Sequence, residues 1–255
     1  MQNFSSENLK LHGQTALVTG GRINLGYHTG LRLLPCGAKV IVSTRYPRDS
    51  EIRYLAEKDS HEWTDSLKIV GADFRAASDV FYLVGVVKDI LKSWALDSIL
   101  KLDILINNTA QTLTDSLEKE RTAVQREQRL LLNEPKSDGR FLHSGSMYQT
   151  RIRGGVPASN PLRPEQNYRL TGTIPGSTSE GHNNTAKVTP TKNTLLEITS
   201  QPKASSWMQS LDEIPYEDII SAHSINTFVP LILIRELLLV IGSPRSRTNP
   251  SSVIK

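Results

Sequence analysis

The stretch from Thr15 to Gly26 constrains the fold of this chain more than any other part of the sequence. Its first five residues are apolar or β-branched, and they lead directly into a turn that begins with Gly20 and Gly21. Such a run predicts a buried strand of a parallel sheet. Glycine lets the backbone come close to a bound phosphate, and a helix that starts at the turn directs free N–H groups toward it. The stretch therefore predicts the beginning of an α/β domain with a phosphate site.

Strands and helices alternate along the next ninety residues. Further strands are expected at 38–43, 67–71 and 102–106, and helices at 25–34, from about 49 to 58 and from Ser78 onward. Asp49 or Ser50 is expected to cap the second helix, and Ser78 the third. Alternation of this kind gives a parallel sheet with right-handed crossovers. The predicted fold class is α/β, a Rossmann-type doubly wound parallel sheet.

The alternation stops after Thr112. One polar helix is expected over 116–132, with Leu117, Val124 and Leu131 on one face. From 139 to 206 the chain is rich in glycine and proline and poor in apolar residues, which predicts a largely disordered segment. We interpret 113–206 as an insertion in a single domain that spans 1–255.

Regular structure is expected to return with a long helix from about 215 to 240 and a fifth strand at 252–254. The fold would continue beyond that strand, so the sheet is expected to be incomplete at its C-terminal side. Leucines of the long helix would then be partly uncovered and the fifth strand would be an open edge, features that suit a homo-oligomer.

Composition bears on the partners, the cellular compartment and the metal content to be expected of this chain. The net charge is only +4 and there is no basic stripe with interleaved aromatic residues, which argues against a nucleic-acid partner. The single cysteine, Cys36, suits a reducing compartment, and the N-terminus lacks the layout of a signal peptide. The longest apolar run, 228–241, is interrupted by two charges, so no membrane span is expected. Cys36 and the histidines show no metal-ligand spacing. We expect a cytoplasmic protein without a metal.

The candidate cofactor residues follow the strands. The glycine turn contributes the first set: Gly20, Gly21, Arg22, Asn24, Leu25 and Gly26. The end of the second strand contributes Thr44 and Arg45. An acidic residue at this position would bind the ribose hydroxyls of NAD, whereas a hydroxyl and an arginine suit the 2′-phosphate of NADP, to which Arg22 could add. NADP is favoured over NAD, and the alternative is that Arg45 is a solvated surface residue.

Two further groups complete the candidate cofactor site. Asp73 follows the third strand, where the chain would pass the adenine, although a role as a turn or helix cap is equally compatible with its position. Asn107, Asn108 and Thr109 follow the fourth strand, where side-chain amides can tie the strand end to its neighbours and line the cleft.

These motifs resemble the short-chain dehydrogenase/reductase superfamily over residues 11–112 and 207–255. The family motif Thr-Gly-x-x-x-Gly-x-Gly corresponds to Thr19, Gly20, Asn24 and Gly26, and Asn-Asn-Ala-Gly corresponds to residues 107–110. Asn24 replaces a motif glycine, but asparagine tolerates a left-handed backbone better than most residues. The resemblance assigns Asn226 as the asparagine of the catalytic site.

The resemblance implies NAD(P)(H)-dependent reduction of a small-molecule carbonyl or oxidation of an alcohol. The family's serine and its Tyr-x-x-x-Lys pair would follow the fifth strand, which here ends the chain. Tyr54 and Lys58 have the right spacing, but they follow the second strand, and we interpret them as a coincidence on a surface helix. Two hypotheses stand. The first is an NADP-type reductase represented by an incomplete chain, which predicts no turnover. The second is a catalytically dead NADP-binding module whose polar insertion recruits a protein partner.

Overall fold

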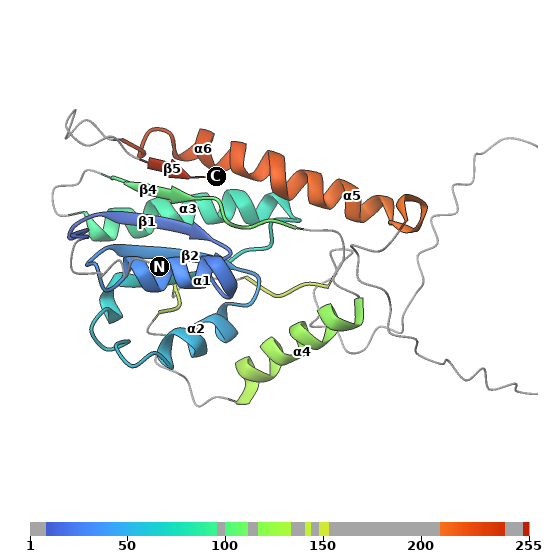
Figure 1. The fold of residues 1–255 in the computed structure, drawn as a ribbon, viewed down its shortest axis with the longest axis horizontal. Helices are drawn as coiled ribbons and strands as arrows, with labels where there is room; N and C mark the ends of the chain where they lie inside the picture. The colour runs from blue at the N-terminus through green and yellow to red at the C-terminus, as the bar shows by residue number, and fades with distance from the viewer. Residues whose placement is uncertain are drawn as a thin grey trace, which may run out of the picture.

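The computed structural model describes residues 9–95, 100–111, 117–133, 141–143, 148–152, 210–242 and 252–254. Their centre is a parallel sheet of five strands in the order β3-β2-β1-β4-β5 (Figure 1). The strands are β1 (Thr15–Thr19), β2 (Lys39–Thr44), β3 (Leu67–Gly71), β4 (Ile104–Ile106) and β5 (Ser252–Ile254). This order, which starts in the middle and grows outward in both directions, confirms the doubly wound α/β fold.

Helices cover both faces of the sheet. They are α1 (Asn24–Leu33), α2 (Pro47–Leu55), α3 (Ala77–Trp94), α4 (Leu117–Asn133), α5 (Tyr216–His223) and α6 (Val229–Leu237), with a π-helical turn at Ser224–Phe228 between the last two and 3₁₀ turns at Thr64–Ser66 and Leu211–Glu213. Helix α4 lies beside α2 rather than on the sheet (Figure 1).

Alternate residues of the central strand enter two separate cores because side chains of a strand point to opposite faces. Leu17 of β1 packs with α3 and α6, in a cluster that includes Val87 and Leu233. Ala16 and Val18 pack on the other face with residues of α1 and α2, among them Tyr54. Both faces are covered by hydrophobic side chains, which explains why the strands read as continuous apolar runs.

The expected helix caps are wrong. Helix α2 begins one turn early because Pro47 occupies its first position, where a fixed φ suits the helix, so Asp49 and Ser50 lie inside it. Helix α3 starts at Ala77, which places Ser78 within the first turn. The N-terminus of α2 is instead satisfied from outside, since the Glu127 carboxylate accepts hydrogen bonds from the backbone N–H groups of residues 48 and 49.

The helix predicted over 116–132 is confirmed as α4, but its buried face is different. Val124 is buried together with Glu120 and Glu127, whereas Leu131 is half exposed. The difference arises because α4 packs against a charged edge of the domain, formed by Arg45, Arg75 and the N-terminus of α2, and not against an apolar core. Contacts with these charged and polar partners, rather than burial of leucines, determine which face of α4 points inward.

The segment predicted to be largely disordered, 139–206, lies mostly outside the described residues. Its described part is packed on the domain: Phe141 is fully buried and stacks on Trp63. The backbone of Ile69 in β3 donates to the Phe141 carbonyl (2.7 Å) and accepts from His143 N–H (3.1 Å). Phe141 thus attaches this part of the chain to the edge of the sheet, and Arg151 adds an ion pair with Asp79 at 3.0 Å.

The long C-terminal helix is confirmed as the run from α5 through the π turn to α6, and the fifth strand pairs in parallel with β4. Several apolar side chains of this helix are exposed, with Leu239 the most exposed at 92%. Within the described residues, no helix combines the length and apolar character that crossing a bilayer requires.

Candidate cofactor site

The glycine turn after β1 has the backbone shape that a phosphate cradle needs. Gly20 lies in the left-handed region (φ +70°), as does Asn24 (φ +52°), which confirms that asparagine can replace the motif glycine here. A Cβ atom on Gly26 would collide with the Gly20 carbonyl oxygen and with the amide of Asn108. Helix α1 begins within this turn at Asn24 and has no side-chain cap, so its first N–H groups are free of intrahelical partners, and Leu25 beside them is largely exposed.

The turn is held from two sides. The Asn108 amide donates to the carbonyl oxygens of Thr19 (3.1 Å) and Gly20 (3.3 Å), and Thr109 N–H donates to the Thr19 hydroxyl (2.9 Å). These bonds join the ends of β1 and β4, as predicted for the asparagines. Both polar side-chain atoms of Asn107 are buried without a hydrogen-bond partner among the described residues. Buried polar atoms are normally paired, so Asn107 points to a group that the described chain does not supply.

Tyr54 is the second support, and the interpretation of it as a surface residue is wrong. Its side chain is completely buried, and its hydroxyl donates to the Gly21 carbonyl oxygen at 2.9 Å. Burial raises the pKa of this hydroxyl above its usual value, which keeps it protonated as a donor. Tyr54 therefore supports the glycine turn from the protein interior, while Lys58 is exposed on the surface.

Arg22 and Arg45 come together around one aromatic ring. The guanidinium carbon of Arg22 lies 4.8 Å from the Tyr46 ring centroid, and that of Arg45 lies 5.5 Å from it. Thr44 is nearly buried, and its hydroxyl accepts a hydrogen bond from Tyr46 N–H (3.1 Å). Arg45 is thus packed against a neighbour rather than merely solvated, and the Tyr46 ring brings together one cation from the turn after β1 and one from the end of β2.

Both arginines also have carboxylate partners. Arg22 pairs with Asp49 at 2.7 Å, and Arg45 approaches Glu120 at 3.5 Å. Burial opposes ionisation of Asp49, but hydrogen bonds from Arg22 and Arg53 outweigh it and hold the pKa of this carboxyl below its usual value. The ionised Asp49 carboxylate therefore pairs with several arginines, namely Arg22, Arg53 and Arg126.

Asp73 is engaged in local contacts. Its carboxylate accepts hydrogen bonds from the backbone N–H of Arg75 (3.1 Å) and from Nε of the same residue (2.9 Å), while its own N–H donates to Asp79. This geometry corresponds to the turn-cap alternative. The guanidinium of Arg75 also pairs with Glu120, so α4 is tied to the end of β3.

Asn226 lies in the π turn between α5 and α6, on the side of the sheet where β4 ends. Its amide makes two hydrogen bonds with the backbone of Gln111, one accepted from N–H (2.9 Å) and one donated to the carbonyl (3.0 Å). Insertions of this type in a helix occur frequently at functional sites. The structure therefore connects Asn226 to the chain that follows Asn107 and Asn108, as a shared site requires.

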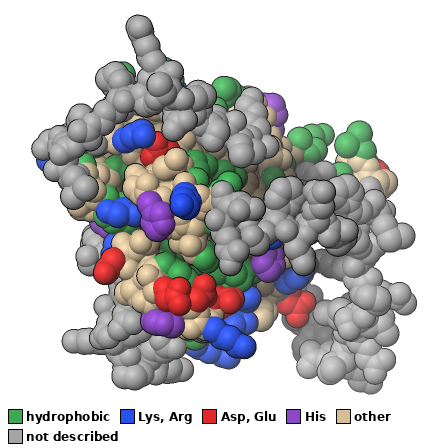
Figure 2. Space-filling model, turned by 60° about the vertical axis from the view of Figure 1, so that its left-hand side comes forward, with side chains coloured by type: hydrophobic (Ala, Val, Ile, Leu, Met, Phe, Trp, Pro, Cys, Tyr) green, Lys and Arg blue, Asp and Glu red, His purple; other side chains and the backbone are tan. Residues whose placement is uncertain are grey.

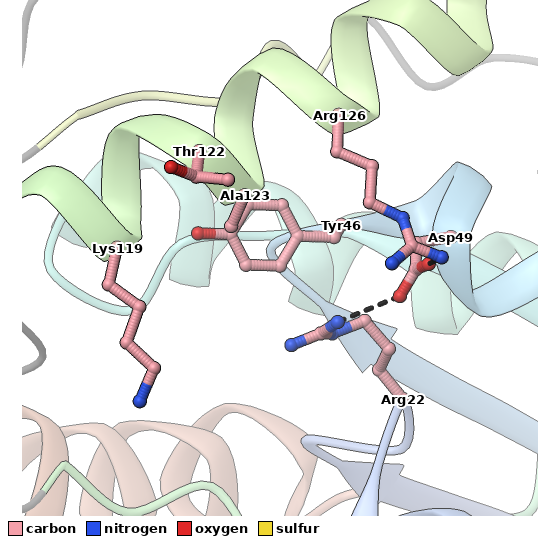
Figure 3. Close-up of a pocket in the computed structure, with 7 residues that line it drawn as sticks. All are labelled: Arg22, Tyr46, Asp49, Lys119, Thr122, Ala123 and Arg126. Atoms are coloured by element: carbon pink, nitrogen blue, oxygen red, sulfur yellow. Dashed lines mark hydrogen bonds and ion pairs between the residues drawn. The ribbon is translucent and has the colours of Figure 1, made fainter.

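The sequence reasoning missed the role of α4. Arg22, Tyr46 and Asp49 face Lys119, Thr122, Ala123 and Arg126 of that helix across a cavity of about 290 Å³ (Figure 3). Acidic and basic side chains lie next to each other on the molecular surface as well (Figure 2). A usable signal was the spacing of Glu120, Val124 and Glu127, which places them on one helix face. The described residues contain no group of His, Cys, Asp and Glu suited to a metal ion.

The ionisation of Glu127 gives a prediction for stability. Burial raises the pKa of this carboxyl, with a smaller opposing effect from the two N–H groups that it accepts. The folded protein therefore holds its proton more tightly than the unfolded chain, so this group's contribution to stability falls as pH rises through the raised pKa. We expect Glu127→Gln to remove this pH dependence. Urea unfolding from pH 4 upward should then show that the free energy of unfolding of the variant rises relative to that of the parent as pH increases. Parallel pH profiles would contradict this.

No protein-family model matches the chain. Among curated proteins, an uncharacterized protein, R665, of Acanthamoeba polyphaga mimivirus is 36% identical over 110 residues, which are 43% of this chain and 22% of the relative. A short chain dehydrogenase/reductase, dpchH, of Colletotrichum higginsianum is 32% identical over 106 residues, 41% of this chain and 24% of the relative. The chain thus spans about a quarter of the length of the curated relatives that it matches.

Solved structures of similar fold include the reductase LugOII, described as catalysing keto-reduction in lugdunomycin biosynthesis (26% identity, TM-score 0.36, 48% of this chain and 55% of that one). Another is the RhlG/NADP complex of Pseudomonas aeruginosa (22% identity, TM-score 0.34, 49% and 48%). Over 106 residues the chain is thus similar to a short-chain dehydrogenase/reductase, the family that its motifs resemble.

Proposed function

We propose that this chain is the dinucleotide-binding part of an NADP-preferring oxidoreductase of the short-chain dehydrogenase/reductase type, which reduces a small carbonyl compound or oxidises an alcohol. The observation that carries the proposal is the pair of arginines, Arg22 and Arg45, on the Tyr46 ring at the end of β2. A carboxylate at the end of β2 would repel a 2′-phosphate, whereas guanidinium groups bind it. RhlG, whose structure is described as an NADP complex, is compatible with this choice.

The residues present fit such a cofactor. Glycine at positions 21 and 26 lets the turn pack closely, because a Cβ atom there would collide with Val42 or with the Gly20 carbonyl oxygen. The N-terminus of α1 provides N–H groups and a favourable dipole for a pyrophosphate. Asn107, whose buried amide has no partner in the part of the chain that the structure describes, would line the cleft beyond the pyrophosphate. The bound dinucleotide would supply hydride transfer. The role of the protein residues in this region is to bind and orient it and to keep water away.

Asn226 is the residue that we assign to the catalytic side of the cleft. Its two bonds to Gln111 hold the segment after β4 in place, which makes it a positioning residue in the conformation described. We further propose one domain over 1–255 with 113–206 inserted, a cytoplasmic location in which the buried thiol of Cys36 stays reduced, and a homo-oligomer formed through the exposed apolar side chains of α5 and α6.

The test measures the binding of NADPH and of NADH to the full chain by titration calorimetry. We expect tighter binding of NADPH, and we expect Arg45→Ala to weaken NADPH by about ten- to hundredfold, the effect of losing one charge-assisted hydrogen bond, without weakening NADH. Arg32→Ala, which removes an arginine from the last turn of α1, is the control. Equal affinity for both dinucleotides, or no binding, would contradict the proposal. Saturable NADPH binding without turnover of any carbonyl substrate would favour the alternative, a catalytically dead binding module.

A further inference from the structure

Helix α4 is fixed at the end of β2 and β3 by two buried carboxylates. Glu127 accepts hydrogen bonds from the N–H groups of Arg48 (2.6 Å) and Asp49 (2.9 Å), and Glu120 pairs with Arg75. Glu120 is 5% exposed and Glu127 is 1% exposed. The two residues are seven positions apart, about two helical turns, so together they determine both the place and the rotation of the helix.

This rotation turns the adjacent face of α4 toward the cavity beside the glycine turn. Lys119, Thr122, Ala123 and Arg126 share one helix face through their spacing of three and four residues. Arg22 reaches the cavity from the opposite side, and Figure 3 shows the side chains of Lys119 and Arg22 extending toward the same open space. A volume of about 290 Å³ accommodates a phosphate group.

The charges around the cavity favour an anion. Three of its lining residues, Arg22, Lys119 and Arg126, are cationic, and Asp49 is its only acidic lining residue. Asp49 is already shared, because it pairs with Arg22 at 2.7 Å and with Arg126 at 2.9 Å. Among the lining residues, the cations therefore outnumber the carboxylate, a composition that a phosphate monoester, with nearly two negative charges, complements.

We propose that Lys119 and Arg126 of α4 are specificity-determining residues that, together with Arg22, bind the 2′-phosphate of NADP. The inference rests on the proposed function, because Arg22 and Tyr46 follow β1 and β2, between which the adenosine ribose of a dinucleotide is expected. Helix α4 lies in the segment that the family motifs do not cover. Helix α4 thus supplies two of the three cations that would distinguish NADP from NAD in this cavity.

The experiment compares NADPH, NADH and adenosine 2′,5′-bisphosphate in calorimetric titrations of the full chain. Lys119→Ala and Arg126→Ala are each expected to weaken NADPH and the bisphosphate by about ten- to hundredfold, and to leave NADH unchanged. Arg129→Ala is the matched control, because it removes the same charge from an exposed position on α4 that does not line the cavity. Thermal unfolding verifies that each variant is folded.

The outcomes separate the two proposals. If the parent chain prefers NADPH but Lys119→Ala and Arg126→Ala bind it as tightly as the parent, the role of α4 is refuted and the proposed function stands. An equal loss in Arg129→Ala would also refute it, since a general charge effect would then explain the result. If the parent binds neither NADPH nor the bisphosphate, the proposed function fails as well.

Discussion

Replacing Tyr54 with alanine is expected to lower the free energy of unfolding by about 3–5 kcal/mol, the usual cost of truncating a fully buried aromatic side chain. Tyr54 has no exposed surface, and its ring lies 4.8 Å from that of Tyr27 and 6.1 Å from that of Trp63 (centroid distances). No smaller side chain can fill this position, because α1, α2 and the sheet converge on it. Urea or thermal unfolding of the two proteins measures the difference.

Tyr54→Phe separates the ring from its hydroxyl. Only the hydrogen bond to the Gly21 carbonyl is lost, so we expect a smaller cost of about 0.5–1.5 kcal/mol. Because that bond shapes the glycine turn, cofactor binding should weaken more than the change in stability alone implies. If Tyr54→Phe left binding unchanged, or if Tyr54→Ala cost less than about 1 kcal/mol, the support of the turn by Tyr54 would be disproved.

The sheet and the glycine turn could be predicted from the sequence because their signals are local. β1 and β3 have the predicted bounds, since apolar runs flanked by glycine leave few alternatives. The left-handed backbone of Asn24 also followed from its place in the motif. In each case, the conformation of a few consecutive residues is determined by those residues and by burial on both faces of the sheet.

The charged edge could not be predicted because its partners are distant in sequence. Glu127 caps α2 although it lies 79 positions away from Arg48, whereas the prediction considered only neighbouring residues, Asp49 and Ser50. Tyr54 was misplaced on the surface for a similar reason: its spacing to Lys58 was informative only about the helix, not about the turn that it supports. The burial of Glu120 and Glu127 becomes understandable only when Arg75 and the N-terminus of α2 are in view.

Arg75→Ala is expected to reduce the free energy of unfolding by about 3–5 kcal/mol, because it leaves two buried carboxylates without their shared cation. Asp73 is 2% exposed and Glu120 is 5% exposed, and the Arg75 guanidinium is the group that bridges them. The loss would release α4 from the end of β3, so the cavity beside Arg22 should lose its outer wall. Chemical unfolding monitored by circular dichroism gives the stability of each variant.

Arg53→Ala is the matched control for this arginine. It removes a cation from a side chain that is 39% exposed, and the buried Asp49 carboxylate keeps Arg22 and Arg126 as partners. We therefore expect a cost of about 1 kcal/mol or less. The double variant Arg75→Ala/Glu120→Gln should recover part of the loss, since it removes one of the two buried carboxylates that Arg75 bridges. Equal effects of Arg75→Ala and Arg53→Ala, or no recovery in the double variant, would show that the Asp73–Arg75–Glu120 bridge does not hold α4 in place. Recovery of stability without recovery of NADPH binding would show that the bridge acts on the cofactor site through the position of α4.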